Sequence, residues 1–270
     1  MPVTISVLSQ KGGTGKTTTV RTLTDAFRRA GLSVLAVDLD PQGNLSDYLG
    51  VDPDATPTIA DVLTGRAPAR EAVHDGVIPA DLTLAEAELA LGGRIGRELT
   101  LQRALRDLAG SDVVLIDCPP SLGLLTVNAL VASDHALLSA EAQYFALQGV
   151  EQALEVIKLA RDTLNQRLSV LGILLNIADM RTRHSREALD SLRAHYPQQL
   201  LGTPIRSSIA YAESAQRAVS ILDLRPDLAA DYLAVAEELL GRLGLAQAQR
   251  RIARLARELA PPPERAPAGG

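Results

Sequence analysis

A glycine-rich segment near the start of the chain has the residue types and spacing of a phosphate-binding loop. It reads KGGTGKTT at positions 11–18 and follows an apolar run at residues 3–8. The glycines let the backbone turn tightly, so that its N–H groups converge on an anion. The positive end of a following helix adds to that attraction. We therefore expect this segment to bind a nucleoside triphosphate, with Lys16 on the β- and γ-phosphates and the Thr17 hydroxyl on Mg²⁺.

Two carboxylates follow the second predicted strand, at the point where that strand ends. Asp38 and Asp40 alternate with Leu39 and lead into the turn-forming sequence PQGN at 41–44. Ligands of an open parallel sheet bind beyond the carboxyl ends of its strands, so both acids would approach the phosphates that Lys16 binds. Taken alone, the two acids are equally well explained as turn formers. The glycine-rich loop upstream favours a functional role.

A third acid closes a strand-like run farther along the chain. The sequence DVVLID at 112–117 is typical of a buried central strand that carries a carboxylate at its ligand end. In proteins that transfer phosphoryl groups, an acid at this place binds Mg²⁺ directly or through water, and we expect Asp117 to do so. The next residue, Cys118, is expected to be small, buried and inert.

Taken together, these motifs resemble those of the ParA/MinD superfamily of ATPases. The standard P-loop has a glycine five residues before Gly15, where this chain has Gln10, and Lys11 completes the deviant form KGGxGKT[ST]. The segments DLDPQGN at 38–44 and DCPPS at 117–121 match further signatures of the superfamily. The resemblance covers residues 1–243 and is strongest to the ParA (Soj-type) proteins that partition chromosomes and plasmids.

The resemblance implies an ATPase that hydrolyses ATP to ADP and phosphate as a dimer. It assigns catalytic roles to Asp40, which orients the attacking water, to Lys16, and to Lys11, which reaches the ATP of the other subunit. It implies that Mg²⁺, the cofactor, is held by four side chains: Thr17, Asp38, Asp40 and Asp117.

At the nucleoside end, the resemblance implies that one asparagine lies against the adenine and that the segment 203–210 packs beneath it. The expected ATP-binding residues are therefore Lys11, Gly12, Gly13, Thr14, Gly15, Lys16, Thr17, Thr18, Asn176, Pro204, Ile205 and Arg206.

Three arginines within six residues, Arg181, Arg183 and Arg186, are expected at a loop and the start of a helix. ParA proteins carry a basic residue that contacts DNA at the position of Arg181. Many have a second arginine where this chain has Ala210, and Arg206 is the expected substitute. A solvated, charged loop is the alternative interpretation. The resemblance further implies non-specific binding of double-stranded DNA, a homodimer formed on ATP binding, and a ParB-like partner that stimulates hydrolysis.

The composition of the chain and its residue patterns restrict the possible folds. The chain has 270 residues, 46% of them apolar, and a net charge of −5, so DNA binding would require a local basic patch. Alternating strand and helix patterns predict an α/β fold with a doubly wound, mostly parallel sheet flanked by helices. The chain shows neither a long apolar run nor a signal-peptide pattern, and it has one cysteine. We therefore expect a cytoplasmic, nucleoid-associated protein.

We divide the chain into an ATPase domain at 1–245, a basic amphipathic helix at 246–260 and a disordered tail at 261–270. The helix sets Arg250, Arg251, Arg254 and Arg257 against Ile252, Leu255 and Leu259. Such a helix can bind a membrane or DNA. MinD proteins use a tail of this kind on membranes, but with bulkier apolar residues, so we expect no membrane binding. Two alternatives remain open: a MinD-like membrane-cycling ATPase, and a nucleotide-dependent module that acts on protein cargo.

Overall fold

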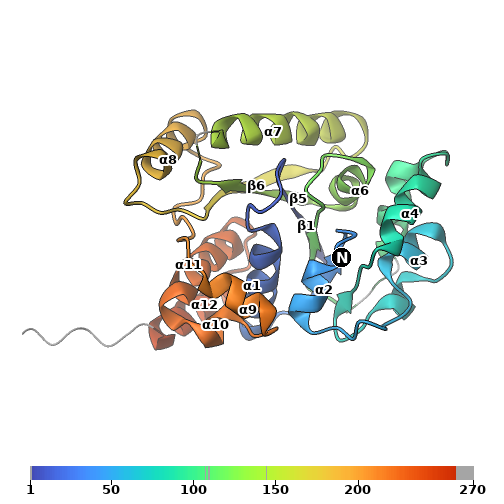
Figure 1. Cartoon of the computed structure of the whole chain (residues 1–270), viewed down its shortest axis with the longest axis horizontal. Helices are drawn as coiled ribbons and strands as arrows, with labels where there is room; N and C mark the ends of the chain where they lie inside the picture. The colour runs from blue at the N-terminus through green and yellow to red at the C-terminus, as the bar shows by residue number, and fades with distance from the viewer. Residues whose placement is uncertain (1, 107, 109, 144, 260–270) are drawn as a thin grey trace, which may run out of the picture.

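One parallel sheet forms the centre of the molecule (Figure 1). The computed structural model describes residues 2–106, 108, 110–143 and 145–259. Within them the strand order is β3-β2-β4-β1-β5-β6, and every pairing is parallel. This confirms the predicted α/β fold. The strands are β1 (Val3–Leu8), β2 (Val34–Asp38), β3 (Val77–Ile78), β4 (Val113–Asp117), β5 (His135–Glu141) and β6 (Ser169–Asn176).

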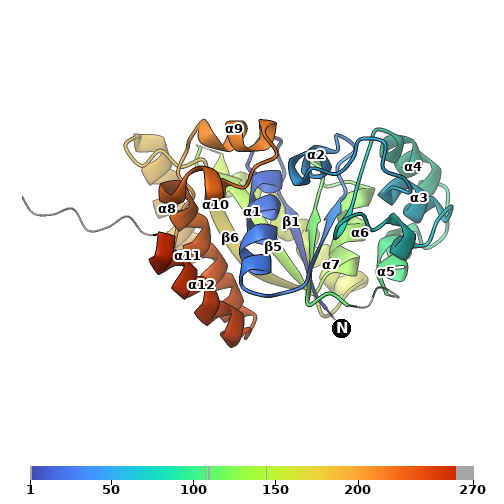
Figure 2. The ribbon, with the colours of Figure 1, turned by 90° about the horizontal axis from the view of Figure 1, so that it is seen from below.

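Helices cover both faces of the sheet, as Figures 1 and 2 show from two directions. The apolar core is accordingly split into two clusters, one on each face. Within the described residues, no helix combines the length and apolarity that a membrane span requires. The α-helices are α1 (Lys16–Arg29), α2 (Asn44–Leu49), α3 (Ile59–Thr64), α4 (Thr83–Leu91), α5 (Thr100–Leu105), α6 (Leu124–Ala132), α7 (Ala146–Thr163), α8 (Arg183–His195), α9 (Ala210–Gln216), α10 (Ile221–Leu224), α11 (Pro226–Arg242) and α12 (Ala246–Leu259).

The register of the central strands brings the predicted motifs to one edge of the sheet. Asp117, the last residue of β4, pairs with Val7 of β1 on one side and with Asp38 of β2 on the other. Central strands with helices on both faces are apolar throughout, and β2 and β4 are buried along their whole length. The glycine-rich loop and both acidic segments therefore leave the sheet side by side.

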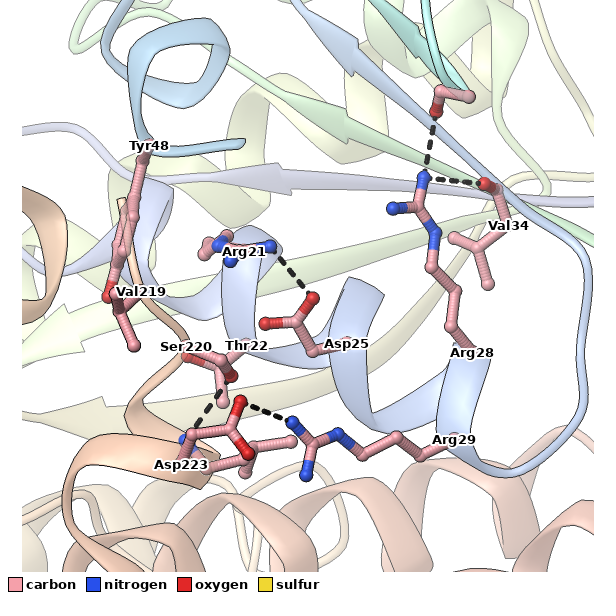
Figure 3. A network of polar contacts seen from close by, with 12 residues as sticks. Arg21, Thr22, Asp25, Arg28, Arg29, Val34, Tyr48, Val219, Ser220 and Asp223 are labelled. Atoms are coloured by element: carbon pink, nitrogen blue, oxygen red, sulfur yellow. Dashed lines mark hydrogen bonds and ion pairs between the residues drawn. The ribbon is translucent and has the colours of Figure 1, made fainter. Parts of the chain in front are cut away.

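Helix α1 carries the loop at its start, and polar contacts fasten it to its surroundings (Figure 3). Near the middle of the helix, Arg21 pairs with Asp25 at 2.7 Å, and its guanidinium lies 5.4 Å from the centre of the Tyr48 ring. Near the end, Arg28 donates to the carbonyl of Val34 at 3.2 Å, and Arg29 pairs with the carboxylate of Asp223 in α10 at 2.6 Å. The helix is thereby tied to β2, α2 and α10.

The described part of the chain between β3 and β4 forms two separate α-helices. α4 ends at Leu91 and α5 begins at Thr100, with a short 3₁₀ turn, η2 (Arg97–Leu99), between them. Together with α3 and a second 3₁₀ turn, η1 (Ala69–Ala72), these helices lie at the β3 end of the molecule (Figure 1).

The basic helix at the end of the described chain, α12, packs onto the body of the protein. Ala248 and Ile252 are buried in the same cluster as residues of α1 and α11. Arg251 donates to the carbonyl oxygen of Ala30, just after α1, at 2.9 Å. The predicted disordered tail, residues 261–270, lies outside the described residues.

Candidate nucleotide-binding site

A cleft of about 730 Å³ opens at the carboxyl edge of the sheet, in front of the glycine-rich loop. This volume lies within the range typical of small-molecule and cofactor sites. Its walls include loop residues 12–18, Asp40, Asn176, Ile205 and Arg206. The structure thus brings the loop, one of the predicted acids and most of the predicted nucleoside-end residues to a single cleft. Pro204 is not among the residues that line it.

Lys16 begins α1 and is held in place behind the loop. Its side chain is largely buried, and Nζ donates to the Ser9 hydroxyl at 3.0 Å. The Ser9 hydroxyl also accepts a hydrogen bond from the Thr14 hydroxyl at 2.9 Å and donates its own proton to the carbonyl of Lys11 at 2.7 Å. Ser9 therefore organises both the loop and its lysine. Sequence analysis missed it; its position between strand and loop was the available signal.

Asp117 and Thr17 lie together at the base of the loop. The Thr17 hydroxyl donates to Asp117 Oδ2 at 2.7 Å, whereas the buried Oδ1 has no hydrogen-bond partner. Burial, reinforced by the nearby Asp38 carboxylate, raises the pKa of Asp117 to about 8. A desolvated carboxylate oxygen without a donor is stabilised by a proton or a cation. The pair therefore fits Mg²⁺, which is usually bound by one or two carboxylates and the substrate's phosphates.

Asp38 has both carboxylate oxygens occupied by protein donors. Oδ1 accepts from the backbone N–H of Asp40 at 3.1 Å, and Oδ2 accepts from the backbone and hydroxyl of Ser46 at 2.9 and 2.8 Å. Its burial still raises its pKa, to about 6. In this structure Asp38 fixes the turn that carries Asp40; its predicted support of Mg²⁺ remains a prediction.

Asp40 and Lys11, the other two predicted catalytic residues, occupy different surroundings. Asp40 lines the cleft and accepts from the N–H of Gln42 at 3.0 Å. Lys11 is 69% exposed and lies beside a smaller neighbouring cavity, with Nζ 3.3 Å from Gln143 Oε1 and 3.7 Å from Glu141 Oε2. Lys16 and Asp40 therefore share the cleft, and Lys11 lies outside it.

Asn176 lies directly behind the loop. Its Nδ2 donates to the hydroxyls of Thr19 at 3.1 Å and Ser139 at 2.8 Å. Gly15 has φ +80°, and a Cβ atom there would come within 3.1 Å of the Asn176 amide, so only glycine fits this turn. The structure places Asn176 where it braces the loop; its predicted contact with adenine is not tested by these contacts.

Three tyrosines that sequence analysis did not single out also line the cleft: Tyr48, Tyr211 and Tyr232. Tyr211 and Tyr232 meet edge to face, with ring centroids 5.9 Å apart. They come from α2, α9 and α11, so only the folded chain brings them together. Aromatic rings of this kind give a small-molecule site its apolar walls.

The four arginines predicted to bind DNA are exposed and locally paired. Arg181 makes a two-point contact with Asp179, with both distances 2.9 Å. Arg183, the first residue of α8, pairs with Glu187 at 2.6 Å. Arg186 donates to the carbonyls of Met180 and Arg181, both at 3.1 Å. Arg206 pairs with Asp231 at 2.7 Å.

These four arginines gather at the β6 end of the sheet. Arg181, Arg183 and Arg186 follow β6, and the backbone of Arg206 bridges to Ala178, just beyond that strand. Exposed ion pairs contribute little to stability, so a phosphate could replace the carboxylate partners of Arg181 and Arg183 at small cost.

Comparison with known proteins identifies the relatives of this chain. A family model described as "AAA domain" matches residues 3–170. The chain is 36% identical over 259 residues to the chromosome partitioning protein ParA of Myxococcus xanthus, covering 92% of both chains. It is 40% identical over 247 residues to the chromosome-partitioning ATPase Soj of Thermus thermophilus, covering 88% of this chain and 96% of that one.

Solved structures with a similar fold contain nucleotides. A cobyrinic acid a,c-diamide synthase from Mycobacterium smegmatis with bound ADP and magnesium superposes with a TM-score of 0.72 at 40% identity, covering 81% of this chain and 93% of that one. The septum site-determining protein MinD of Pyrococcus horikoshii, complexed with Mg-ADP, has a TM-score of 0.74 at 28% identity, covering 91% of this chain and 98% of that one.

Proposed function

Because this chain belongs to the ParA/Soj family of chromosome-partitioning ATPases, we propose that it binds ATP with Mg²⁺, dimerises, and hydrolyses the ATP to drive DNA segregation. The observation that carries this proposal is the arrangement at the base of the loop. A buried lysine, a threonine hydroxyl and a carboxylate with one unpaired oxygen converge where the glycine-rich turn meets the cleft.

Phosphoryl transfer depends chiefly on positioning and on neutralising the phosphate charge. Backbone N–H groups of the loop and the start of α1 would hold the β- and γ-phosphates, and Lys16 would add its charge. Asp40 lines the same cleft and is our candidate for orienting the attacking water.

Thr17 and Asp117 are the side chains that would hold Mg²⁺. The ion supplies positive charge to the phosphate oxygens when it is bound. Asp38 supports this group indirectly, because it fixes the backbone of Asp40.

Lys11 supports a dimeric mechanism. In the isolated chain its side chain lies outside the cleft, against Glu141 and Gln143 on and just after β5. Because it lies outside the cleft of its own chain, Lys11 is our candidate for contacting the ATP of a second molecule. A cation supplied from a second molecule is worth roughly 10³–10⁵ in rate in GTPases where it has been measured.

DNA binding is the proposed output of the ATP-bound dimer. The exposed arginines Arg181, Arg183 and Arg186 would contact phosphates, with Arg206 beside them, and a dimer doubles the number of contacts. Phosphate contacts are independent of sequence, as expected for a protein that associates with the nucleoid. A ParB-like partner would stimulate hydrolysis and so release the DNA.

The packing of α12 supports this function over membrane cycling. An amphipathic helix binds a membrane through its apolar face. Here Ala248 and Ile252 on that face are buried against the body of the protein. The helix would have to detach before it could insert into a bilayer.

The test is an ATPase assay on the full chain, with and without random-sequence duplex DNA and a ParB-like protein from the same genome. We expect slow hydrolysis alone, faster hydrolysis with both additions, and no ATP binding by Lys16→Ala. If DNA and the partner protein together leave the rate of hydrolysis unchanged, the proposed role in DNA partitioning is refuted. Unchanged ATP affinity of Lys16→Ala would refute the assignment of the loop.

A further inference from the structure

Helix α12 has two faces of opposite character. Ala248 and Ile252 are buried on one face, and Leu255 packs on the same cluster. Arg250, Arg254 and Arg257 are exposed. At 3.6 residues per turn these three arginines lie within about 60° of one another, on the side opposite Ile252, and form a row about 10 Å long.

The orientation of this arginine row (Arg250, Arg254 and Arg257) is fixed by the packing of the helix. Arg251, next to the row, is committed to the carbonyl of Ala30 at 2.9 Å and lies over Gly31. Arg251 therefore helps to dock the helix, and the row is left facing outward. Because the docked helix already fixes the backbone of the row, binding a ligand restricts only the rotamers of the arginine side chains.

The row is locally basic on an acidic protein. α12 contains four arginines and one glutamate, a net charge of +3, whereas the whole chain has −5. The glutamate, Glu258, pairs with Arg254 at 2.8 Å between exposed side chains, a contact that contributes little and that an anion can displace. A polyanion is therefore the ligand chemistry that fits the row.

Figures 1 and 2 both draw α8, α11 and α12 at the same end of the molecule, away from α3 and α4. α8 begins at Arg183, within the arginine segment already assigned to DNA. α8 packs in one core cluster and α12 in the other, so the row is a second basic surface at that end of the molecule.

We propose that the arginine row of α12 is a second contact surface for the phosphates of double-stranded DNA. The inference rests on the proposed DNA binding. An anionic membrane is the competing ligand for a basic helix, but that mode needs the apolar face, which is buried here. DNA phosphates require only the exposed charges.

The test compares the full chain with a variant that carries Arg250→Gln, Arg254→Gln and Arg257→Gln. Both are loaded with a slowly hydrolysed ATP analogue and titrated with a fluorescent random-sequence duplex over a range of salt concentrations. Each phosphate contact contributes about 0.9 to the slope of log K against log salt, so the slope should fall by about 2.7 per protomer. The affinity near 100 mM salt should fall at least about tenfold.

The matched control removes the same charge elsewhere. Arg66, Arg70 and Arg94 are exposed and lie around α3, η1 and α4, at the opposite end of the molecule. Their triple glutamine variant should keep the salt slope of the unmodified protein. A variant with Arg250→Lys, Arg254→Lys and Arg257→Lys should also keep the salt slope, because phosphate contacts need charge more than a specific geometry.

The outcomes separate the two proposals. If the unmodified protein fails to bind DNA, the proposed function fails. If it binds DNA and the glutamine variant matches it in slope and affinity, only the role of α12 is overturned. Loss of binding in the lysine variant as well would show that the arginines act on folding rather than on phosphates. Both proteins are also mixed with anionic phosphatidylglycerol vesicles. If the glutamine variant loses binding to the vesicles but keeps its binding to DNA, the row is assigned to membranes instead.

Discussion

The charged form of Asp117 is unfavourable in the folded protein, because one of its carboxylate oxygens has no hydrogen-bond donor. Thr17 satisfies Oδ2, but Oδ1 is buried without a donor, and the Asp38 carboxylate lies on the neighbouring strand. Burial raises the pKa of Asp117, so near neutral pH the folded, nucleotide-free protein favours a proton there more than the unfolded chain does. A bound cation would remove this unfavourable free energy, because it would neutralise the buried carboxylate.

The first prediction concerns pH. Since the folded pKa of Asp117 is about 8 against an ordinary value of 3.8, its contribution favours folding at low pH and is lost as the pH rises toward 8. The melting temperature of the nucleotide-free protein should therefore fall between pH 6 and pH 8.5. Asp117→Asn should flatten this fall, as measured by thermal denaturation in both buffers. An equal fall in the two proteins would assign the effect to other groups.

The second prediction concerns Asp40. Asp40→Ala should retain ATP binding and ATP-dependent dimerisation, because the loop and Lys16 are unchanged. Turnover should fall at least about 100-fold, the usual scale for losing a group that manages proton transfer. Size-exclusion chromatography with ATP and a phosphate-release assay measure the two properties. Normal turnover would reassign the role of orienting water.

Residue types and spacing brought Lys16, Thr17 and Asp40 to one cleft, whereas Lys11 lies outside it. They did not reveal which hydrogen bonds each makes. Ser9 carries no motif of its own, and its role depends on the bend that brings Lys16 back over it. The occupied oxygens of Asp38 likewise depend on Ser46 of α2, which no spacing rule connects to the acid.

At the scale of elements, the loop is braced from behind by the ends of two strands. Ser139 of β5 donates to the carbonyl of Thr14 at 2.7 Å, and Asn176 of β6 donates to Ser139 and to Thr19 of α1. These bonds join β5, β6, the loop and α1 in one buried network. Networks of this kind fix geometry when every member is satisfied.

The third prediction tests this brace. Asn176→Ala removes a hydrogen-bond donor from two buried hydroxyls and should cost about 1–3 kcal/mol of stability, with weaker ATP binding. Ser139→Ala should weaken the same network, so the double variant should lose less than the sum of the two single variants. Urea denaturation and nucleotide titration give both quantities. Strict additivity would show that the two residues act independently.

At the scale of the whole molecule, α12 is part of the packed body. The sequence predicted an amphipathic helix at this place, with a basic side that could bind a membrane or DNA. What the apolar side packs against could not be deduced, because its partners, α1 and α11, contribute residues that are distant in sequence. The parallel sheet, by contrast, followed from the alternation of strand and helix patterns along the chain.

The fourth prediction follows from that packing. Ile252 is fully buried, so Ile252→Ala should destabilise the protein by about 2–5 kcal/mol. The loss should appear as a shift of one cooperative transition, because α12 shares its cluster with α1 and α11. Arg250→Ala on the exposed side should change stability by less than about 0.5 kcal/mol. A separate early transition confined to α12 would show that the helix undocks independently.

The burial of Cys118 has a practical consequence. It is the only cysteine in the chain, and none of its surface is accessible. Burial also raises the pKa of its thiol, so the reactive thiolate is scarce in the native state. A maleimide dye should therefore label the native protein only where a new cysteine is introduced. Gln247→Cys on α12, paired with a labelled duplex, would let single molecules report by energy transfer when this helix approaches DNA during turnover.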